Sequence, residues 1–311
     1  MKELFSAIVG EENVYLNEPM AGHTTFKIGG PCDCLVCPLS IEAFGKVLAT
    51  CAKEDIPYFV LGNGSNILVS DEGIRGVVVS TEKLTHHHIE GTTIEVEAGA
   101  LLADVSTLAL EAGLTGLEFA CGIPGSIGGA VYMNAGAYDG EMREIIEKVT
   151  LFDAQGNKVV LGNEEMAFSY RHSRLKDEPL LCASVTLSLQ AGEKDAIRAK
   201  IEDLTERRES KQPLELPSAG STFKRPVGYY AGVLIIEAGL QGHQIGGAQV
   251  STKHAGFVVN VDHATADDVI RLIYHIQQTI LEKNQVRLET EVRFIGAWEN
   301  HPLIDKIMKT E

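Results

Sequence analysis

The sequence lacks any long hydrophobic run. No stretch approaches the roughly 20 apolar residues that span a membrane, and residues 1–16 contain no run of signal-peptide length. These absences predict a protein without a membrane segment and with a cytoplasmic location. Six cysteines agree with a reducing compartment, which would leave them as thiols. They are Cys32, Cys34, Cys37, Cys51, Cys121 and Cys182.

Positive charge is also scarce. Lysine and arginine together number 27 against 43 aspartates and glutamates, which gives a formal net charge of −16. A chain this acidic is not expected to bind nucleic-acid polymers, although a local basic pocket for a phosphorylated small molecule remains compatible with it. Its 44% hydrophobic and 23% charged residues are typical of a folded globular protein, and its 311 residues predict two or three domains.

Signals for metal sites and for hydrolases are missing. The spacing of Cys32, Cys34 and Cys37 is too tight for a paired zinc motif, so we expect buried strand thiols there. The histidines at 86–88 have no motif around them and are expected on an exposed turn. No Gly-x-Ser-x-Gly elbow occurs, which argues against a hydrolase nucleophile. What is abundant is glycine, about 10% of the chain against a usual ~7%.

Local patterns predict helices and strands in mixed order. Ser40 caps a helix over 41–53, Gly113 ends a helix over 103–112, and Thr265 with Asp268 forms a capping box before a helix with an apolar stripe. The charged segment 195–211 is expected to be an exposed helix or a connector, with a domain boundary beside it. Strands are expected at 58–61, 67–70, 76–80, 93–98, 148–153, 158–161, 180–189, 256–260 and 289–295, with a further helix at 232–238. Because βαβ alternation is not regular, the predicted class is α+β.

Two glycine-rich segments are candidate ligand sites. In 61–66, Gly62 and Gly64 let backbone N–H groups converge on an anion, and the Ser65 and Asn66 side chains add donors. A plain hairpin turn is the alternative. The second segment, 122–138, is apolar as well as glycine-rich, which favours backbone packed against a flat or bulky group. A cofactor ring or pyrophosphate satisfies that pattern, and so does a close helix–strand contact in the core.

Charged residues mark two further segments. The arginines of 168–174 suit a carboxylate or a phosphate, with a solvated loop as the alternative. In 288–296, period-two alternation places Glu289, Glu291 and Arg293 on one strand face, which is either solvated or lines a cleft.

A serine follows unusually small residues in 218–226. Ala219 and Gly220 would let a ligand approach the hydroxyl of Ser221, and Lys224 and Arg225 supply the positive charge that the chain as a whole lacks. A third glycine pair lies in apolar company at 242–248.

Taken in order, these segments resemble the UDP-N-acetylenolpyruvoylglucosamine reductase family. The matching stretches are 24–30, 61–68, 117–140, 170–173, 219–224, 242–260 and 288–296, so that the resemblance runs from about residue 15 to 296. It implies an FAD-binding half of the vanillyl-alcohol-oxidase (PCMH) type at 1–205, made of two α+β subdomains at about 1–80 and 81–205. It also implies an α+β substrate-binding domain at 206–311, whose last strand and tail return to the flavin half.

The resemblance implies a reaction as well. NADPH would reduce FAD and leave, and the enolpyruvyl ether of UDP-N-acetylglucosamine would take its place and become UDP-N-acetylmuramate, a peptidoglycan precursor. Hydride would pass from flavin N5 to C3 of the enolpyruvyl group, and a proton would reach C2. The implied partners are these small molecules, without nucleic acid or membrane, and the implied state is a monomer or a weak dimer.

Site residues follow from the matching motifs. The implied catalytic set is Arg171, which stabilises the developing negative charge, Ser221, which delivers the proton, and Glu291, which is protonated or orients Arg171 or a water. The implied FAD-binding residues are Gly62, Asn63, Gly64, Ser65, Asn66, Pro124, Gly125, Ser126, Gly128 and Gly129. The implied substrate-binding residues are Lys211, Lys224, Arg225 and Gln244.

The chain departs from parts of the family and leaves rivals open. Some members carry a tyrosine-bearing loop before the substrate domain, whereas 191–211 here contains no tyrosine, as in a shorter subclass. Arg225 stands where other members can carry asparagine. One rival is a flavin oxidase of the same fold, which would release hydrogen peroxide. The other is a non-catalytic nucleotide-binding regulator, against which the presence of all three catalytic residue types argues.

Overall fold

The chain divides into two compact units, each built from several sequence segments. The structure is a computed structural model that describes residues 1–299 and 301–308. Unit 1 comprises Met1–Leu16, Cys34–Asn63 and Gly76–Arg208, and unit 2 comprises Asn17–Asp33, Gly64–Arg75 and Glu209–Glu311. Within the described residues, no helix is both long and apolar enough to cross a membrane.

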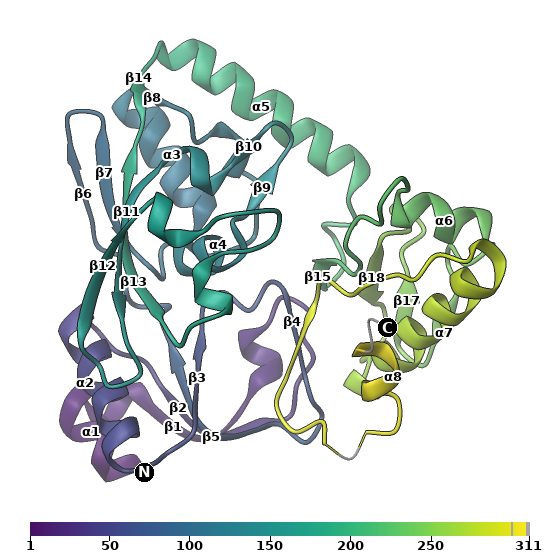
Figure 1. The fold of residues 1–311 in the computed structure, drawn as a ribbon, viewed down its shortest axis with the longest axis horizontal. Coiled ribbons are helices and arrows are strands. Elements are labelled where there is room, and N and C mark those ends of the chain that lie inside the picture. Colours follow the sequence, from purple (N-terminus) through teal and green to yellow (C-terminus); the bar gives the residue numbers. More distant parts are fainter. Residues whose placement is uncertain (300, 309–311) are drawn as a thin grey trace. The chain divides into compact units, whose positions relative to one another are not determined.

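Unit 1 contains most of the strands (Figure 1). A five-stranded antiparallel sheet has the order β12-β11-β13-β7-β6, and a four-stranded sheet has the order β1-β2-β5-β3, of which β1, β2 and β5 run across the boundaries of the unit. The strands are β1 Val14–Pro19, β2 Pro31–Val36, β3 Tyr58–Leu61, β5 Ile74–Ser80, β6 His87–Glu90, β7 Thr93–Glu97, β11 Ile146–Phe152, β12 Lys158–Gly162 and β13 Leu181–Ser188, with two-residue strands β8 Leu114–Thr115, β9 Gly136–Ala137, β10 Gly140–Glu141 and β14 Gln190–Ala191. The helices are α1 Lys2–Val9, α2 Ile41–Lys53, α3 Leu102–Ala112, α4 Ile127–Met133 and α5 Lys194–Lys211.

Helix α2 forms where the sequence predicts it. The Ser40 side chain accepts a hydrogen bond from the Ala43 backbone N–H, which caps the first turn. The apolar face of the helix is fully buried, and Phe44 meets the Phe152 ring edge-on with centroids 5.8 Å apart. Helices α1 and α2 therefore share one core with the four-stranded sheet, whereas α3 and α4 belong to a second core around the five-stranded sheet.

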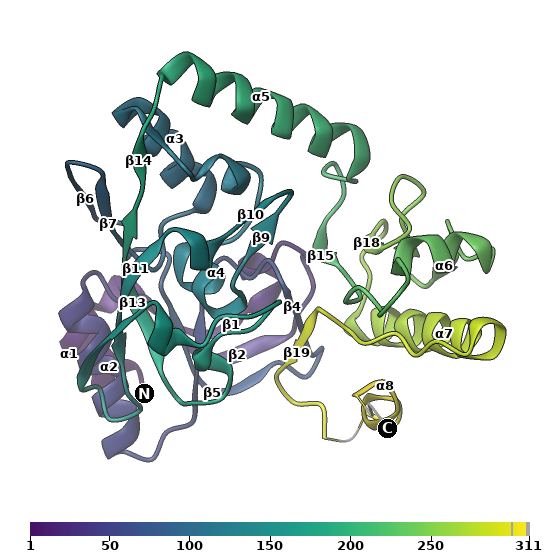
Figure 2. The same cartoon turned by 45° about the horizontal axis from the view of Figure 1, so that its top comes forward.

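Unit 2 is organised around one long helix. A four-stranded sheet has the order β15-β18-β17-β16, and β4 pairs in parallel with β19. The strands are β4 Ile67–Val69, β15 Ser218–Ser221, β16 Gln244–Ile245, β17 Ala248–Val250, β18 Phe257–Asn260 and β19 Arg293–Ile295, and the helices are α6 Ala231–Glu237, α7 Ala266–Asn284 and α8 Ile304–Met308. The predicted stripe of α7 is buried at every position, and Figure 2 shows this helix lying beside α6. Its capping box between Thr265 and Asp268 is present.

A second carboxylate caps α7 from a distant part of the sequence. The Asp71 Oδ1 and Oδ2 atoms accept hydrogen bonds from the backbone N–H groups of Ala266 and Asp267, at 2.9 and 3.1 Å. We expect Asp71→Ala to lower the free energy of unfolding by about 1–2 kcal/mol, because two N–H groups and the positive end of the helix dipole lose their acceptor. Urea unfolding checks this. Glu72→Ala, at the exposed neighbouring residue, should stay within about 0.5 kcal/mol, and an equal loss in both variants would contradict the capping role.

Three local predictions differ from the structure. The last strand is short, because only Arg293–Ile295 forms a regular ladder. Before it, Thr290 forms an isolated β-bridge with Phe223. The histidines are exposed as expected, but His87 and His88 lie on strand β6 rather than on a turn. The segment 61–66 is not a hairpin turn, because β3 pairs in parallel with β5 while β4 pairs with β19.

The charged segment 195–211 was expected to be a helix or a connector, and it is helical, within α5.

The cysteines are thiols in the described part of the chain, and five of the six are buried. Burial raises the pKa of Cys37 to about 12, with a contribution from the nearby Glu82 carboxylate, and burial alone raises the pKa of Cys182 to about 12. The prediction of buried strand thiols is confirmed at Cys32 and Cys34, which lie on β2, whereas Cys37 is buried but lies just beyond the end of that strand.

This burial predicts selective alkylation. At pH 8, N-ethylmaleimide should modify native protein at no more than one site, the half-buried Cys121, because the thiolate is the reactive form and the other thiols are shielded. Protein unfolded in guanidinium chloride should gain all six adducts. Intact-protein mass spectrometry counts them. Rapid modification of several native thiols would contradict the burial.

Candidate functional site

Unit 2 brings Ser221 and Glu291 onto adjacent backbone segments. The Glu291 N–H donates to the Thr222 carbonyl at 2.9 Å, and the Lys224 N–H donates to the Glu289 carbonyl at 2.9 Å. Phe223 and Thr290 form the bridge between these two contacts. The two segments that carry the predicted serine and glutamate, about 70 residues apart in sequence, are therefore hydrogen-bonded to each other.

A bulge presents Ser221 at the end of β15. Ser218 and Ser221 pair with Val259 and Phe257, and the register shifts between these two serines. Gly220, which lies in this interval, has a φ of 73°. Ser221 is exposed, whereas the next residue, Thr222, is buried and its hydroxyl accepts a hydrogen bond from the Val258 N–H. A Cβ added to Gly220 would meet nothing within 4 Å, so this side of the serine is open, as the small residues before it predict.

Asn66 is hydrogen-bonded to the backbone of the Glu291 segment. Its Nδ2 atom donates to the Glu291 carbonyl at 3.2 Å, and its own carbonyl accepts from the Arg293 N–H at 3.0 Å. These bonds continue the parallel pairing of β4 with β19. Gly64 lies close to another backbone segment, since an added Cβ would lie 2.2 Å from the His23 carbonyl oxygen. The second half of the 61–66 segment is thus fixed beside Glu291 within unit 2.

The predicted substrate-binding residues of unit 2 are exposed or half-buried. Lys224 forms an ion pair with Glu289 at 3.0 Å, which offsets its charge near Ser221. The Arg225 guanidinium lies over the Tyr230 ring at 4.1 Å, and the Gln244 side chain donates to the Gly246 carbonyl at 2.9 Å. Lys211, the last residue of α5, is exposed.

The glycine pair at 246–247 has a packing role. The Gly247 N–H donates to the Asp268 carboxylate at 3.2 Å, and a Cβ on Gly246 would overlap that same carboxylate, whose oxygens lie 2.1 and 2.3 Å from its position. Asp268 belongs to the capping box of α7, so these glycines let the chain pass the start of that helix.

Unit 1 brings the first half of segment 61–66 to the second glycine-rich segment. The Asn63 side chain donates to the Pro124 carbonyl at 2.8 Å. A Cβ on Gly62 would lie 2.4 Å from the Ser126 hydroxyl oxygen, and that oxygen lies 3.5 Å from the Gly129 backbone nitrogen at the start of α4. The two predicted cofactor segments therefore meet here, as a common cofactor contact requires.

Part of the second segment is packed in the core. The Ile127 and Gly128 N–H groups donate to the Ala100 and Ala98 carbonyls, each at 2.8 Å, and a Cβ on Gly128 would lie 3.0 Å from the Ala98 Cβ. The core-contact interpretation thus holds at Gly128. Pro124 and Gly129 are exposed, so the segment also offers a surface on which a cofactor can lie.

Arg171 lies at a strained turn of unit 1. Its φ is 54°, a left-handed conformation that an arginine rarely adopts, and Ser169 and His172 exchange backbone hydrogen bonds at 3.1 Å around it. The guanidinium donates to the Gly136 carbonyl at 3.3 Å and lies 5.4 Å from the Tyr170 ring centre. The surrounding structure maintains a conformation that costs of order 1–3 kcal/mol, which is frequent at functional sites.

Comparison with known proteins assigns the family. Residues 212–295 match the profile described as UDP-N-acetylenolpyruvoylglucosamine reductase, C-terminal domain, and residues 32–162 match the profile described as FAD binding domain. The UDP-N-acetylenolpyruvoylglucosamine reductase of Caldanaerobacter subterraneus subsp. tengcongensis is 51% identical over 93% of this chain and 96% of its own length. The chain belongs to the UDP-N-acetylenolpyruvoylglucosamine reductase family. It is accordingly an FAD-dependent oxidoreductase.

Two further comparisons agree. A reductase of the same name from Clostridium perfringens is 52% identical over 94% of this chain and 97% of its own. The crystal structure of UDP-N-acetylenolpyruvylglucosamine reductase from Thermus caldophilus matches with a TM-score of 0.78 and 36% identity, over 91% of this chain and 98% of that one. The predicted family and the predicted fold, an α+β FAD-binding domain followed by a C-terminal α+β domain, are confirmed.

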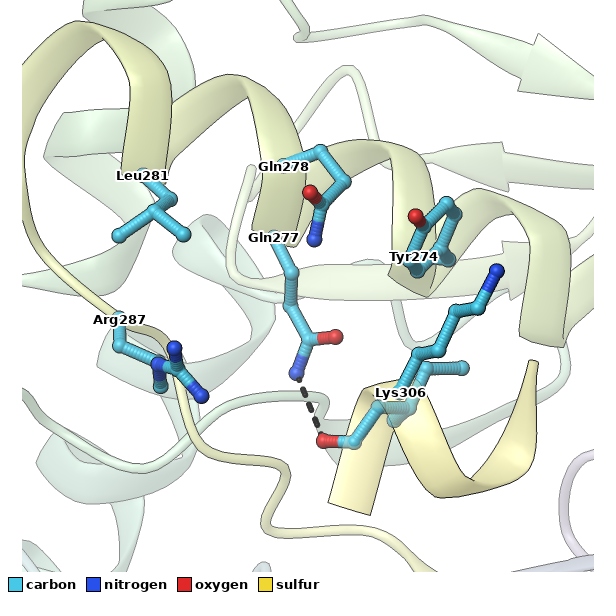
Figure 3. A pocket seen from close by; sticks show the side chains of 7 residues that line it. Tyr274, Gln277, Gln278, Leu281, Arg287 and Lys306 are labelled. Atoms are coloured by element: carbon cyan, nitrogen blue, oxygen red, sulfur yellow. Dashed lines mark hydrogen bonds between the residues drawn. The ribbon is translucent and has the colours of Figure 1, made fainter. Parts of the chain in front are cut away.

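A separate pocket of about 280 Å³ lies between α7 and α8 (Figure 3). The side chain of Gln277 spans it and donates to the Leu288 and Ile307 carbonyls at 2.9 and 3.3 Å. The Lys306 ammonium lies over the Tyr274 ring at 5.8 Å. Since these contacts tie α8 to α7, the pocket marks the place where the C-terminal helix docks.

Proposed function

We propose that this chain reduces the enolpyruvyl ether of UDP-N-acetylglucosamine to UDP-N-acetylmuramate, with NADPH as the reductant, in peptidoglycan precursor synthesis. The observation that carries the proposal is the backbone pairing of the Ser221 and Glu291 segments, in a chain of the reductase family. It supports a serine and a glutamate carried by neighbouring backbone segments. We further propose a cytoplasmic location, where NADPH and nucleotide sugars are made, and a monomer or weak dimer.

FAD would lie along the two glycine-rich segments, and the fit is favourable. Asn63 and Pro124 are already hydrogen-bonded, and Gly62 faces Ser126 where any side chain would collide. When bound, FAD supplies a centre that takes a hydride from one substrate and gives it to another. We propose an FAD-binding half at 1–205 and a substrate domain at 206–311. The proposed FAD contacts are Gly62, Asn63, Gly64, Ser65, Asn66, Pro124, Gly125, Ser126, Gly128 and Gly129.

Ser221 would give its hydroxyl proton to C2 of the enolpyruvyl group. A serine hydroxyl is a weak acid, so its value lies in position rather than in a matched pKa. Gly220 and the bulge leave that hydroxyl exposed on an open side of β15. Lys224 would assist this proton transfer less than its place in the sequence implies, because its ammonium nitrogen is paired with a Glu289 carboxylate oxygen at 3.0 Å. Lys211, Arg225 and Gln244 remain our candidates for contacts to the anionic nucleotide.

Arg171 would stabilise negative charge that develops at C2 and on the substrate carboxylate. A guanidinium offers several donors to such an oxygen anion, and its position is preset by the left-handed turn at residue 171. Glu291 would act in its protonated form or by orienting Arg171 or a water, since a bare carboxylate would repel the developing charge.

Two measurements test this function. The purified protein should show flavin absorbance, and anaerobic NADPH should bleach it. The UDP-sugar enolpyruvyl ether should then restore the absorbance and yield the lactyl ether. A protein without flavin would refute the proposal, and reoxidation only by oxygen with release of peroxide would favour the flavin-oxidase rival.

A further inference from the structure

Arg208, in the last turn of α5, has buried nitrogens without partners. Its Nε and Nη1 atoms are inaccessible and form no hydrogen bond with any described residue. Burial lowers the pKa of this guanidinium, and the nearby Tyr138 and Cys121 oppose that shift. Nothing in the sequence distinguishes this residue from the other charged residues of the helix. Buried donors without acceptors are rare in proteins and usually mark a missing partner.

The side chain lies against the start of the second glycine-rich segment. A Cβ added to Gly122 would lie 2.7 Å from Arg208 Cδ and 3.0 Å from Nη1, so a side chain at position 122 would force this arginine to shift. The preceding residue, Cys121, has its sulfur 3.7 Å from the Thr205 hydroxyl of α5, and Tyr138 donates to the Leu204 carbonyl at 3.0 Å. These contacts all lie within unit 1 and fix α5 beside Gly122 and its neighbour Cys121.

The charge of Arg208 is uncompensated within the described residues. Its neighbour Arg207 pairs with Asp203 at 2.9 Å, whereas Arg208 forms no ion pair with any residue that the structure describes. Arg208 is half-buried and has a side-chain hydrogen bond with Tyr138, but this phenol is not a carboxylate that could balance its charge. A guanidinium withdrawn from water without a counter-charge is unfavourable unless an anion joins it. In oxidised FAD the diphosphate is the only group with full negative charge, and guanidinium groups bind phosphate oxygens well.

We propose that Arg208 binds the diphosphate of FAD, next to the backbone of residues 122–125. The inference rests on the family assignment, which makes FAD the cofactor. It adds an FAD-contacting residue outside the glycine-rich loops, and it explains the glycine at position 122 as space for the arginine rather than as a contact of its own.

The first test compares FAD binding by apoprotein. Arg208→Met should weaken the affinity for FAD about 10- to 100-fold, the range for hydrogen bonds to a charged group. Arg207→Met, one residue away but exposed and paired with Asp203, is the matched control and should bind FAD as the wild type does. Gly122→Ala keeps the charge but displaces the side chain, so it should fall between the two. Unchanged affinity in Arg208→Met would overturn the proposal.

A second measurement separates ligand binding from a purely structural role. Because Arg208→Met removes an uncompensated buried charge, its apoprotein should unfold at the wild-type temperature or above it. The rise in unfolding temperature on adding FAD should be smaller than in the wild type. A drop in apoprotein stability with a normal FAD-induced rise would show that Arg208 only supports the fold.

The reduction potential of the bound flavin tests which part of FAD Arg208 contacts. The diphosphate carries the same charge before and after reduction, so Arg208→Met saturated with FAD should keep the wild-type potential. A clearly lower potential would place the guanidinium at the flavin ring and would refute the diphosphate assignment. Wild-type protein that binds no FAD would instead refute the proposed function, so that the two failures are distinct.

Discussion

Ser221→Ala is expected to reduce its flavin with NADPH at the normal rate but to lose reoxidation by the enolpyruvyl substrate, by about 10²- to 10⁴-fold. The reason is that hydride transfer from NADPH needs no proton donor at C2, whereas completing the lactyl ether does. Ser221 is exposed at the end of β15, and its segment pairs with that of Glu291, so the substitution removes a hydroxyl without disturbing a core.

Anaerobic stopped-flow absorbance measures the two half-reactions separately. Ser218→Ala, on the same strand, is the matched control, because its hydroxyl has only a 3.4 Å contact with the Gly220 N–H, and both half-reactions should stay near wild-type rates. If Ser221→Ala reoxidises at the normal rate as well, another group delivers the proton.

Arg171→Ala should slow the second half-reaction about 10²- to 10³-fold, the usual cost of removing a donor to a developing anion. The first half-reaction should change much less, because no substrate carboxylate is present in it. Since alanine keeps a Cβ, the strain of the left-handed turn remains, and the backbone conformation at residue 171 is expected to be the same in both proteins. The comparison therefore reports the guanidinium itself.

Arg174→Ala is the control for Arg171. Its guanidinium pairs with Glu178 at 2.7 Å, four residues along the chain, and its loss should leave both half-reactions intact. Glu291→Gln should resemble Arg171→Ala in slowing mainly the second step. Equal slowing of both steps in either variant would instead indicate that the flavin is misplaced, and the assignment of that residue as catalytic would then be wrong.

Patterns that depend on neighbouring residues were predictable from sequence. The Ser40 cap, the Thr265–Asp268 capping box and the apolar stripe of α7 all form as expected, because each needs only contacts within one or two helical turns. The extent of the last strand was not predictable in the same way. Alternation marks one face of 289–295, but the ladder is regular only where β4 lies alongside.

In the candidate site too, local features were predictable from sequence and long-range contacts were not. Order and spacing of motifs identified the family and the residues Arg171, Ser221 and Glu291, since these signals are written locally in the chain. That the Ser221 segment is bonded to the Glu291 segment depends on partners about 70 residues apart, which no local pattern specifies. Whether their roles match the family remains a prediction until the variants are measured.

The order of the motifs determined the class of protein and the cofactor, through their resemblance to the reductase family. Side-chain periodicity and capping determined most of the helices and strands, because both act over short distances. Only the tertiary structure decided which glycines make room for neighbours and which arginine lacks a counter-charge. Arg207 and Arg208 are indistinguishable in sequence, yet one is paired at the surface and the other has buried nitrogens without partners among the described residues. The difference arises from burial against Gly122, and burial is a property of the folded chain alone.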